Sequence, residues 1–312
     1  MSTVPLVQFR SVTKWYGAVI GVNDVNVELS PGITGLLGPN GAGKSTLIKL
    51  LTGQLRPSLG DVSVCGSSAR SAGARRHLGY CPDADAFYEE MTGRQFVITM
   101  ARLHGMSRTD ARSRTEAVLE EVGMLDRADR KLRGCSKGMR QRIKLAQALV
   151  HEPDVLVVDE PLNGIDPVGR QELMDLFRRC AARGQAVLVS SHILDEMDEL
   201  ADQIIFMGRG RVLAVGSLPE IRAMFAGQPQ QIRIQSPNQR AIAAQLIAWD
   251  NVLKLELQGT DELRLQIIRP DEFFDRFGRQ VLESSFDIQH LEMLDMTTEA
   301  TFEYVMSAVA RF

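Results

Sequence analysis

Residues 38–45 read GPNGAGKS, namely Gly38, Pro39, Asn40, Gly41, Ala42, Gly43, Lys44 and Ser45, and this motif is the strongest indication of the fold in the sequence. It matches the phosphate-loop pattern G-x-x-x-x-G-K-[ST] and lies between an apolar segment and a helical pattern, as that motif requires. Glycines let the backbone wrap a phosphate, and the loop N–H groups and the helix N-terminus attract the anion. We expect Lys44 to reach the β- and γ-phosphates of a nucleotide, Ser45 to bind Mg²⁺ and Thr46 to add a phosphate contact.

A pair of acids follows a second apolar segment, VLVV at 155–158. Asp159 is expected to hold Mg²⁺, mostly through water, which suits a cation that keeps part of its hydration shell. Glu160 comes directly after it, where its carboxylate can orient and polarise the water that attacks the γ-phosphate. Together with the phosphate loop, this pair predicts hydrolysis of a nucleoside triphosphate.

The order of elements around these motifs predicts an α/β core. Short strands separated by turns are expected over residues 4–29, an arginine-rich helical region over about 92–152, and a helix over 168–183. The segment AVLVSSH at 186–192 is again β-branched and apolar. Buried parallel strands that alternate with helices have this pattern.

Composition excludes several classes of protein. The chain has 312 residues, with 36 Lys and Arg against 39 Asp and Glu, so it lacks the basic excess of a nucleic-acid binder and no nucleic-acid partner is expected. No run of about 18 apolar residues predicts a membrane span, and no secretory signal is visible. The cysteines form no CxxC pair and have no histidine at metal-ligand spacing, which predicts reduced thiols in a soluble, cytoplasmic protein. They are Cys65, Cys81, Cys135 and Cys180.

The composition changes at AGQPQQ, residues 226–231, which we interpret as a linker between domains 1–226 and 227–312. The sequence pattern of the second domain predicts the element order β-α-β-β-α-β-α, which is that of a small α+β domain of ferredoxin-like type. Its lack of clustered His, Cys or acidic ligands argues against a metal site there. The expected elements are strands at 232–234, 253–257, 263–267 and 286–291, a hairpin turn at 259–261, and helices over 237–250, from Pro270, and near 298–310.

The motifs and their order resemble the ATP-binding cassette (ABC) ATPases over about residues 4–220. The resemblance implies a P-loop, RecA-like core with an N-terminal antiparallel β subdomain and a helical subdomain at about 84–152. Tyr16, in KWYG, looks like the aromatic residue that stacks on adenine, although a half-buried structural tyrosine is the simpler alternative. His192, in VSSHILDE, looks like the switch histidine, which contacts the γ-phosphate and holds Glu160 and the attacking water in place.

The segment CSKGM at 135–139 resembles the family signature, usually written LSGGQ. Ser136 and Gly138 match it, whereas Lys137 replaces a glycine and Met139 replaces the glutamine. In the family this signature contacts the γ-phosphate held by the opposite protomer, which implies a head-to-tail dimer with two ATP molecules between the subunits. Lys137 is either an added cation beside a phosphate or a solvated lysine.

Two further segments resemble loops that connect sites in this family. Asp166, in NGID at 163–166, looks like part of the D-loop, which joins the two sites across the dimer. Asp83, in LGYCPDADAFYEEMTG, occupies the position of the usual Gln in the loop that couples nucleotide to the transmembrane partner. A carboxylate cannot donate the hydrogen bonds of an amide. Both this acid and the S-K-G-M signature resemble the branch of cassettes that serves ABC-2-type permeases.

The favoured interpretation is an ATP-binding and ATP-hydrolysing subunit of an ABC-2-type exporter, with ATP and Mg²⁺ as cofactors. The expected partners are a separate integral membrane permease and a second cassette, in a homodimer or heterodimer, at the inner face of the cell membrane. Phe87, Tyr88 and Met91 either line the groove that docks this permease or pack as a small satellite core. The alternative is a cassette ATPase without a transporter, acting on a soluble assembly such as the ribosome. The C-terminal domain could be a dimer brace, a permease-docking element or a ligand sensor.

Overall fold

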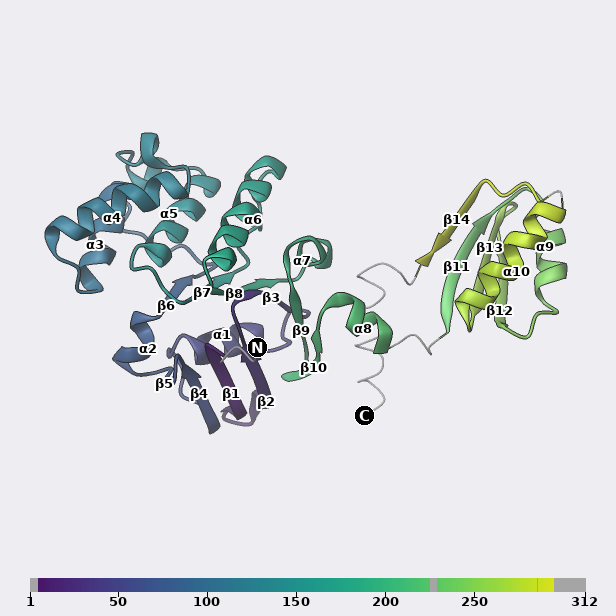
Figure 1. The fold of residues 1–312 in the computed structure, drawn as a ribbon, viewed down its shortest axis with the longest axis horizontal. Coiled ribbons are helices and arrows are strands. Elements are labelled where there is room, and N and C mark those ends of the chain that lie inside the picture. Colours follow the sequence, from purple (N-terminus) through teal and green to yellow (C-terminus); the bar gives the residue numbers. More distant parts are fainter. Residues whose placement is uncertain (1–4, 225–228, 285, 295–312) are drawn as a thin grey trace. The chain divides into compact units, whose positions relative to one another are not determined.

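The computed structural model describes residues 5–224, 229–284 and 286–294. Contacts between residues divide the chain into two compact units, Met1–Ser217 and Leu218–Phe312; in the described residues the first contains two sheets and the second contains one (Figure 1). The sequence predicts a domain boundary at residue 226, nine residues after Ser217, and that boundary stays a prediction. Within the described residues, no helix combines the length and the apolar character needed to cross a bilayer.

The central sheet of the first unit has six strands in the order β10-β9-β3-β8-β7-β6. Five strands run parallel, and β10 pairs antiparallel with β9 at one edge. Strands β7 and β8 are buried almost throughout, which explains why their sequences are nearly continuous apolar runs. The strands are β3 (Gly32–Leu37), β6 (Leu78–Cys81), β7 (Val155–Asp159), β8 (Ala186–Ser191), β9 (Gln203–Gly208) and β10 (Arg211–Gly216).

A second, antiparallel sheet covers the helix that follows the phosphate loop. Its strand order is β2-β1-β4-β5. Helix α1 (Lys44–Leu51) contributes Leu47 and Ile48 to one core with Val7 and Phe9 of this sheet and Val155 of the central sheet. The N-terminus of α1 is therefore fixed by packing on both sides. The strands are β1 (Val7–Tyr16), β2 (Val19–Leu29), β4 (Leu59–Val64) and β5 (Ser67–Ser68).

Three helices between β6 and β7 contact one another and form a group of their own (Figure 1). Polar side chains start each of them: Thr92 and Ser107 accept hydrogen bonds from the first turns of α3 and α4, and Ser136 does the same for α5. The helices are α3 (Gly93–Leu103), α4 (Arg108–Glu121) and α5 (Lys137–Leu149). They lie in the stretch that the sequence predicts to be helical.

The remaining helices of the first unit follow strands of the two sheets. Helix α6 follows β7 and is the predicted helix at 168–183, begun one residue earlier by Pro167. Pro is common at this first helical position because its missing N–H is not needed there. The helices are α2 (Ala72–Arg76), α6 (Pro167–Ala182) and α7 (Leu194–Leu200), with single 3₁₀ turns at Leu125–Arg127 and Leu132–Gly134.

The second unit has the order β11-α9-β12-β13-α10-β14 after a short helix, α8 (Leu218–Met224). Its four strands are all antiparallel and lie in the order β12-β13-β11-β14, which is the split β-α-β arrangement of ferredoxin-like domains. Phe273, Phe277 and Trp249 fill its core. The elements are β11 (Gln230–Gln235), α9 (Gln239–Leu246), β12 (Val252–Gln258), β13 (Glu262–Ile267), α10 (Pro270–Glu283) and β14 (His290–Met293).

Two expected elements of this unit differ from the structure. Helix α9 ends at Leu246 rather than near 250, because the chain turns there to place Trp249 edge-on against Phe273. Strand β14 begins at His290 rather than near 286, because its register partner Gln235 is the last residue of β11. The helix expected near 298–310 lies outside the described residues.

Candidate functional site

The phosphate loop joins β3 to α1, as its sequence context predicts. Lys44 is only 8% exposed, and its Nζ donates hydrogen bonds back to the carbonyl oxygens of Gly38 at 2.5 Å and Pro39 at 3.4 Å. Gly43 has a φ of 106°, and a Cβ there would lie 2.7 Å from the Gly21 carbonyl oxygen. The backbone can adopt this path only with glycine at that position.

Two carboxylates lie near the Lys44 ammonium group. Burial lowers the pKa of Lys44, and the negative charges of Glu160 and Asp159 act in the opposite direction. This electrostatic coupling exists because β3 and β7 are parallel strands of one sheet, so their carboxyl ends meet at one edge. The structure therefore brings together the two motifs that the sequence predicts to act on one nucleotide.

Ser190 ties the two acids to the next strand, and the sequence analysis did not single it out. Its Oγ donates a 2.5 Å hydrogen bond to Asp159 Oδ1 and accepts one of 3.0 Å from the Glu160 backbone N–H. Asp159 and Ser190 are register partners in the parallel pair β7–β8. A polar residue at the same end of both buried strands was the signal that could have identified this contact.

His192 and Glu160 are in direct contact. The Nδ1 of His192 and Oε2 of Glu160 form a hydrogen bond of 2.8 Å, and the Glu160 side chain is 17% exposed against 48% for the histidine. Glu160 itself has a φ of 47°, a left-handed conformation that is strained for a residue with a side chain. The fold thus holds a carboxylate against an imidazole at the end of the strand, where the sequence predicts a general base and its partner.

A second acid, Glu196, lies near this pair, and the sequence analysis did not identify it. Glu196 accepts hydrogen bonds from Arg170 at 2.9 Å and from the Ser191 hydroxyl at 3.3 Å. Burial raises the pKa of Glu196 above its usual range, although the positive charge of Arg170 opposes the shift. Because Ser191 directly precedes His192, this pairing fixes the backbone from which the histidine projects.

Tyr16 lies at the N-terminal end of α1. Its hydroxyl is 3.4 Å from the Thr46 Oγ1, and its ring passes so close to Gly21 that a Cβ there would be 2.7 Å from a ring carbon. The residue is 45% exposed, and the Lys14 ammonium lies 5.6 Å from its ring centre. The assignment of Tyr16 to adenine stays a prediction.

The signature and the D-loop share one groove. A cavity of about 570 Å³ is lined by Ser136, Gly138, Met139 and Asp166, together with parts of α4 and α6. Ser136 and Asp166 are also the N-caps of α5 and α6. The hydrogen bond from the Gly169 N–H holds the pKa of Asp166 below its usual range. Each loop is thus fixed by the helix that it starts.

Lys137 lies across the D-loop of its own protomer. A Cβ placed on Gly164, which has a φ of 69°, would be 2.6 Å from Lys137 Nζ. Gly138 differs, because a Cβ there would only reach ordinary contact, 3.9 Å from Ile165 Cδ1. The protomer's own packing therefore does not require glycine at 138.

The segment that carries Asp83 is held through its backbone. Lys144, on α5, is buried and donates hydrogen bonds to the carbonyl oxygens of Pro82 at 2.9 Å and Asp83 at 2.7 Å. The Asp83 side chain is exposed. The structure fixes the position of this loop without using the carboxylate of Asp83, whose role stays a prediction.

The aromatic residues that follow have different environments. Phe87 packs edge-on against Phe96, with ring centroids 5.0 Å apart, and the Arg140 guanidinium lies 4.9 Å from its ring centre. Tyr88 is 67% exposed, and Met91 is half-buried. Phe87 therefore packs within the protomer, and Tyr88 alone of these three is open to a partner.

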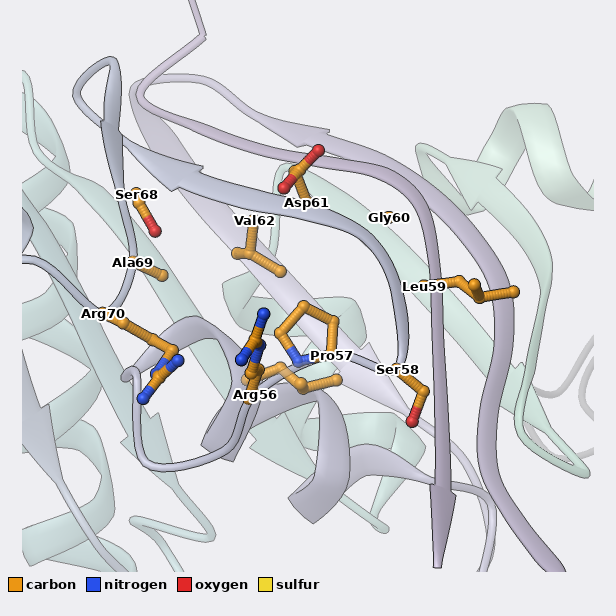
Figure 2. Close-up of a pocket in the computed structure, with 11 residues that line it drawn as sticks. Arg56, Pro57, Ser58, Leu59, Gly60, Asp61, Val62, Ser68, Ala69 and Arg70 are labelled. Carbon is orange, nitrogen blue, oxygen red and sulfur yellow. The ribbon is translucent and has the colours of Figure 1, made fainter.

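A cavity of about 700 Å³ lies against β4, away from the motifs described above (Figure 2). Arg56 and Arg70 line one side of it and Asp61 the other. None of its lining residues belongs to the phosphate loop, the acidic pair or the signature. This cavity is therefore not the nucleotide site, despite its size.

Comparison with known proteins identifies the class of this chain. Residues 22–163 match the protein-family model described as ABC transporter. A solved structure described as the ATP-binding subunit of an ABC transporter superposes with a TM-score of 0.66 at 30% identity, over 70% of this chain and 93% of that one. A dimeric bacterial ABC transporter cassette shares the fold, with a TM-score of 0.63 at 23% identity.

Curated relatives show which kind of ABC protein this chain is similar to. The Nod factor export ATP-binding protein I of Burkholderia orbicola is 38% identical over 220 residues, 70% of this chain and 72% of the relative. The daunorubicin/doxorubicin resistance ATP-binding protein of Streptomyces peucetius is 34% identical over 253 residues, 80% of this chain and 77% of the relative. The chain belongs to the ATP-binding proteins of ABC transporters, whose cassettes bind ATP and are ATPases coupled to transport. The predicted P-loop core and family are thereby confirmed.

Proposed function

We propose that this chain is the energy-supplying subunit of an exporter, and that it drives a separate ABC-2-type permease from the cytoplasmic face of the membrane. ATP hydrolysis, the central part of this proposal, rests on one observation: Lys44, Glu160 and His192 lie close together at one edge of the central sheet. In this arrangement Lys44 binds the β- and γ-phosphates, and Glu160 takes the proton of the attacking water. His192 keeps Glu160 in place through their 2.8 Å hydrogen bond.

The donor set at this edge fits Mg²⁺, which prefers oxygen ligands and retains several waters. Ser45, at the second position of α1, offers a hydroxyl, and Asp159 offers a carboxylate whose Oδ1 is already oriented by Ser190. Bound there, Mg²⁺ would neutralise charge on the phosphates. Thr46 and the backbone of the loop from Gly38 to Gly43 would complete the phosphate cradle.

A head-to-tail dimer is the second part of the proposal. Ser136, Lys137, Gly138 and Met139 would meet the γ-phosphate of the partner protomer, with Asp166 nearby because both loops line one groove. Glycine at 138 is not needed by the protomer's own packing, so a close approach by an outside group explains it better. The solved structure with the same fold that is described as a dimeric cassette supports this part of the proposal.

Export and a membrane partner are inferred from the relatives, two of which are described as export and drug-resistance proteins. Because these relatives are described as ATP-binding proteins, we place the membrane part on another chain. The exposed Tyr88, next to the segment that carries Asp83, is a candidate contact with it.

The test is to purify the Glu160→Gln protein from detergent-solubilised native membranes with ATP and Mg²⁺, and to identify its companions by mass spectrometry. A stoichiometric polytopic membrane protein is expected, because the blocked base holds the ATP-bound state. Lys44→Ala, which should bind ATP much more weakly, is the matched control for capture that does not depend on nucleotide. Recovery of ribosomal proteins or other soluble partners alone would contradict the transporter assignment and leave only the ATPase.

A further inference from the structure

Three side chains that can bind metal ions meet on the first unit, away from the nucleotide site. They are Cys65, His77 and Asp154, and their candidate ligand atoms all lie within 4.8 Å of one another. The sequence gives no hint of this cluster, because its members are far apart in the chain and follow no metal-ligand spacing.

Each of the three residues is anchored to a sheet by its own backbone. The Cys65 N–H donates to the Leu6 carbonyl oxygen at 2.7 Å, in the turn between β4 and β5. The carbonyl oxygen of His77, between α2 and β6, accepts from the Val155 N–H at 2.9 Å. The Asp154 carbonyl oxygen accepts from the Ala186 N–H at the same distance, just before β7. The fold therefore places the three side chains together before any ligand arrives.

The cluster is open to solvent on one side and packed on the other. The side chains of His77 and Asp154 are 45% and 52% exposed. Cys65 is half-buried and packs against the core formed by the two sheets and α1. A small cation can thus enter from water, while the sulfur has an apolar setting.

We propose that Cys65, His77 and Asp154 form a binding site for Zn²⁺, with a water as the fourth ligand. Thiolate, imidazole and carboxylate are the three ligand types that Zn²⁺ uses in proteins, whereas Mg²⁺ accepts oxygen ligands and would not select a thiolate. The thiolate and the carboxylate together balance the charge of the dication. Three protein ligands and one open position is an ordinary tetrahedral arrangement for this metal.

Only small movements are needed to close the site around the metal. Usual zinc–ligand distances put neighbouring ligand atoms about 3.3–3.6 Å apart. His77 Nδ1 and Asp154 Oδ2 are now 2.5 Å apart as a hydrogen-bonded pair, so they would separate by about 1 Å as the metal replaces the shared proton. Burial and the Asp154 carboxylate raise the pKa of the Cys65 thiol, and a cation placed between the two groups would remove that repulsion.

The site would act as a clamp between parts of the cassette. It joins the β4–β5 turn of the antiparallel sheet to the starts of β6 and β7 in the central sheet. Both sheets contribute to the core around α1, whose N-terminus carries the phosphate loop. Zinc bound only by the folded state would therefore stabilise the packing that positions this loop.

Cobalt titration of the nucleotide-free, full-length protein tests the proposal, because a thiolate bound to Co²⁺ gives a charge-transfer band in the near ultraviolet. We expect this band in the parent protein, and its loss when Zn²⁺ is added in competition. Cys65→Ser should abolish the band, and His77→Gln should weaken Zn²⁺ affinity by at least about tenfold. Cys135→Ser, which removes another half-buried cysteine outside the cluster, should leave both unchanged.

Absence of a sulfur-to-cobalt band in the parent protein would overturn the proposal. So would a band that survives in Cys65→Ser, since the metal would then be bound elsewhere. A thermal scan gives an independent measurement: at one Zn²⁺ concentration, the Tm of the parent and of Cys135→Ser should rise equally, and that of His77→Gln should rise less. An equal rise in all three would assign the effect to another site.

Discussion

Lys44 is a buried cation whose hydrogen-bond partners are carbonyl oxygens of its own loop. These oxygens hold the ammonium group in the place where phosphate oxygens would compete for it. The nearby charges of Glu160 and Asp159 keep a positive group favourable there despite burial. The site is thus organised for a phosphate before the nucleotide binds.

Replacing Lys44 with Ala should weaken ATP binding by about 1.5–3 kcal/mol, roughly ten- to hundredfold, because a charge-assisted contact to phosphate is lost. Equilibrium binding of a fluorescent ATP analogue measures this change. Lys49→Ala, on the exposed side of the same helix, is the matched control and should bind as the parent does. Equal affinities of Lys44→Ala and the parent would refute the phosphate-loop assignment.

His151 makes the cassette sensitive to acid. Its ring stacks on that of His104 with centroids 3.7 Å apart, and its Nδ1 is buried without a hydrogen-bond partner. Burial and the positive charge that His104 can carry lower the pKa of His151 from 6.5 to about 4. The unfolded chain therefore binds a proton there before the folded chain does, so stability falls as the pH drops from about 6.5 toward 4.

Between pH 7.5 and 5.5 this histidine should cost the folded state about 1 kcal/mol. Urea unfolding at the two pH values measures the loss, and His151→Gln should lose less because its amide does not titrate. His290→Gln removes an exposed histidine of the second unit and should keep the full acid sensitivity. If His151→Gln were as acid-sensitive as the parent, the loss would have to come from other groups.

At the scale of elements, helix α5 connects the signature to the segment that carries Asp83. Arg140 donates to Asp85 at 2.6 Å and to Glu89 at 2.6 Å, and Lys144, one turn later, pairs with Asp85 at 3.1 Å. Burial opposes ionisation of Asp85, but the hydrogen bonds from Arg140 and Lys144 hold its pKa below the usual range. A movement of α5 at its signature end would therefore be transmitted to this segment.

Lys144→Met should release the segment at 82–89 and destabilise the protein by about 1–3 kcal/mol, because the carbonyl oxygens of Pro82 and Asp83 lose their donor. Hydrogen exchange should be faster in this segment and unchanged in the central sheet. Lys49→Met, an exposed lysine on α1, is the control. Unaltered exchange at 82–89 would show that other contacts hold the loop.

At the scale of the whole molecule, hydrolysis is expected to need two protomers, because in the proposed head-to-tail dimer each would supply the signature to the other's nucleotide. Glu160→Gln should bind ATP but turn it over about 10²–10⁴-fold more slowly, since an amide cannot take the proton of water. In sedimentation it should form a dimer that depends on ATP. Adding Ser136→Arg should prevent the dimer and leave ATP binding intact, because the larger side chain would fill the signature groove.

Glu256→Gln, an exposed acid in the second unit, is the control for loss of a glutamate alone. Its turnover rate should equal that of the parent. Its tendency to dimerise with ATP should also equal that of the parent. An ATP-dependent dimer that persists with Ser136→Arg would mean that the protomers pair through another surface.

Sequence patterns were enough to identify the phosphate loop, the acidic pair after a buried strand, and the alternation of strands and helices that predicts an α/β core. These are local features: a glycine that must accept a φ of 106°, or an apolar run that must be buried, acts on its immediate neighbours in the chain. The same logic located the described elements of the second unit, apart from the end of α9 and the start of β14, which depend on Trp249 and on the length of β11. The helix predicted near 298–310 stays a prediction.

Contacts between residues from different strands could be identified only in the folded structure. Ser190 bridges Asp159 and Glu160 because β7 and β8 are parallel and in register, and Lys144 holds the Asp83 segment because α5 packs against the end of β6. Cys65, His77 and Asp154 meet because two sheets pack around α1. Such contacts depend on register and packing between distant segments, and a single sequence carries no local pattern for them.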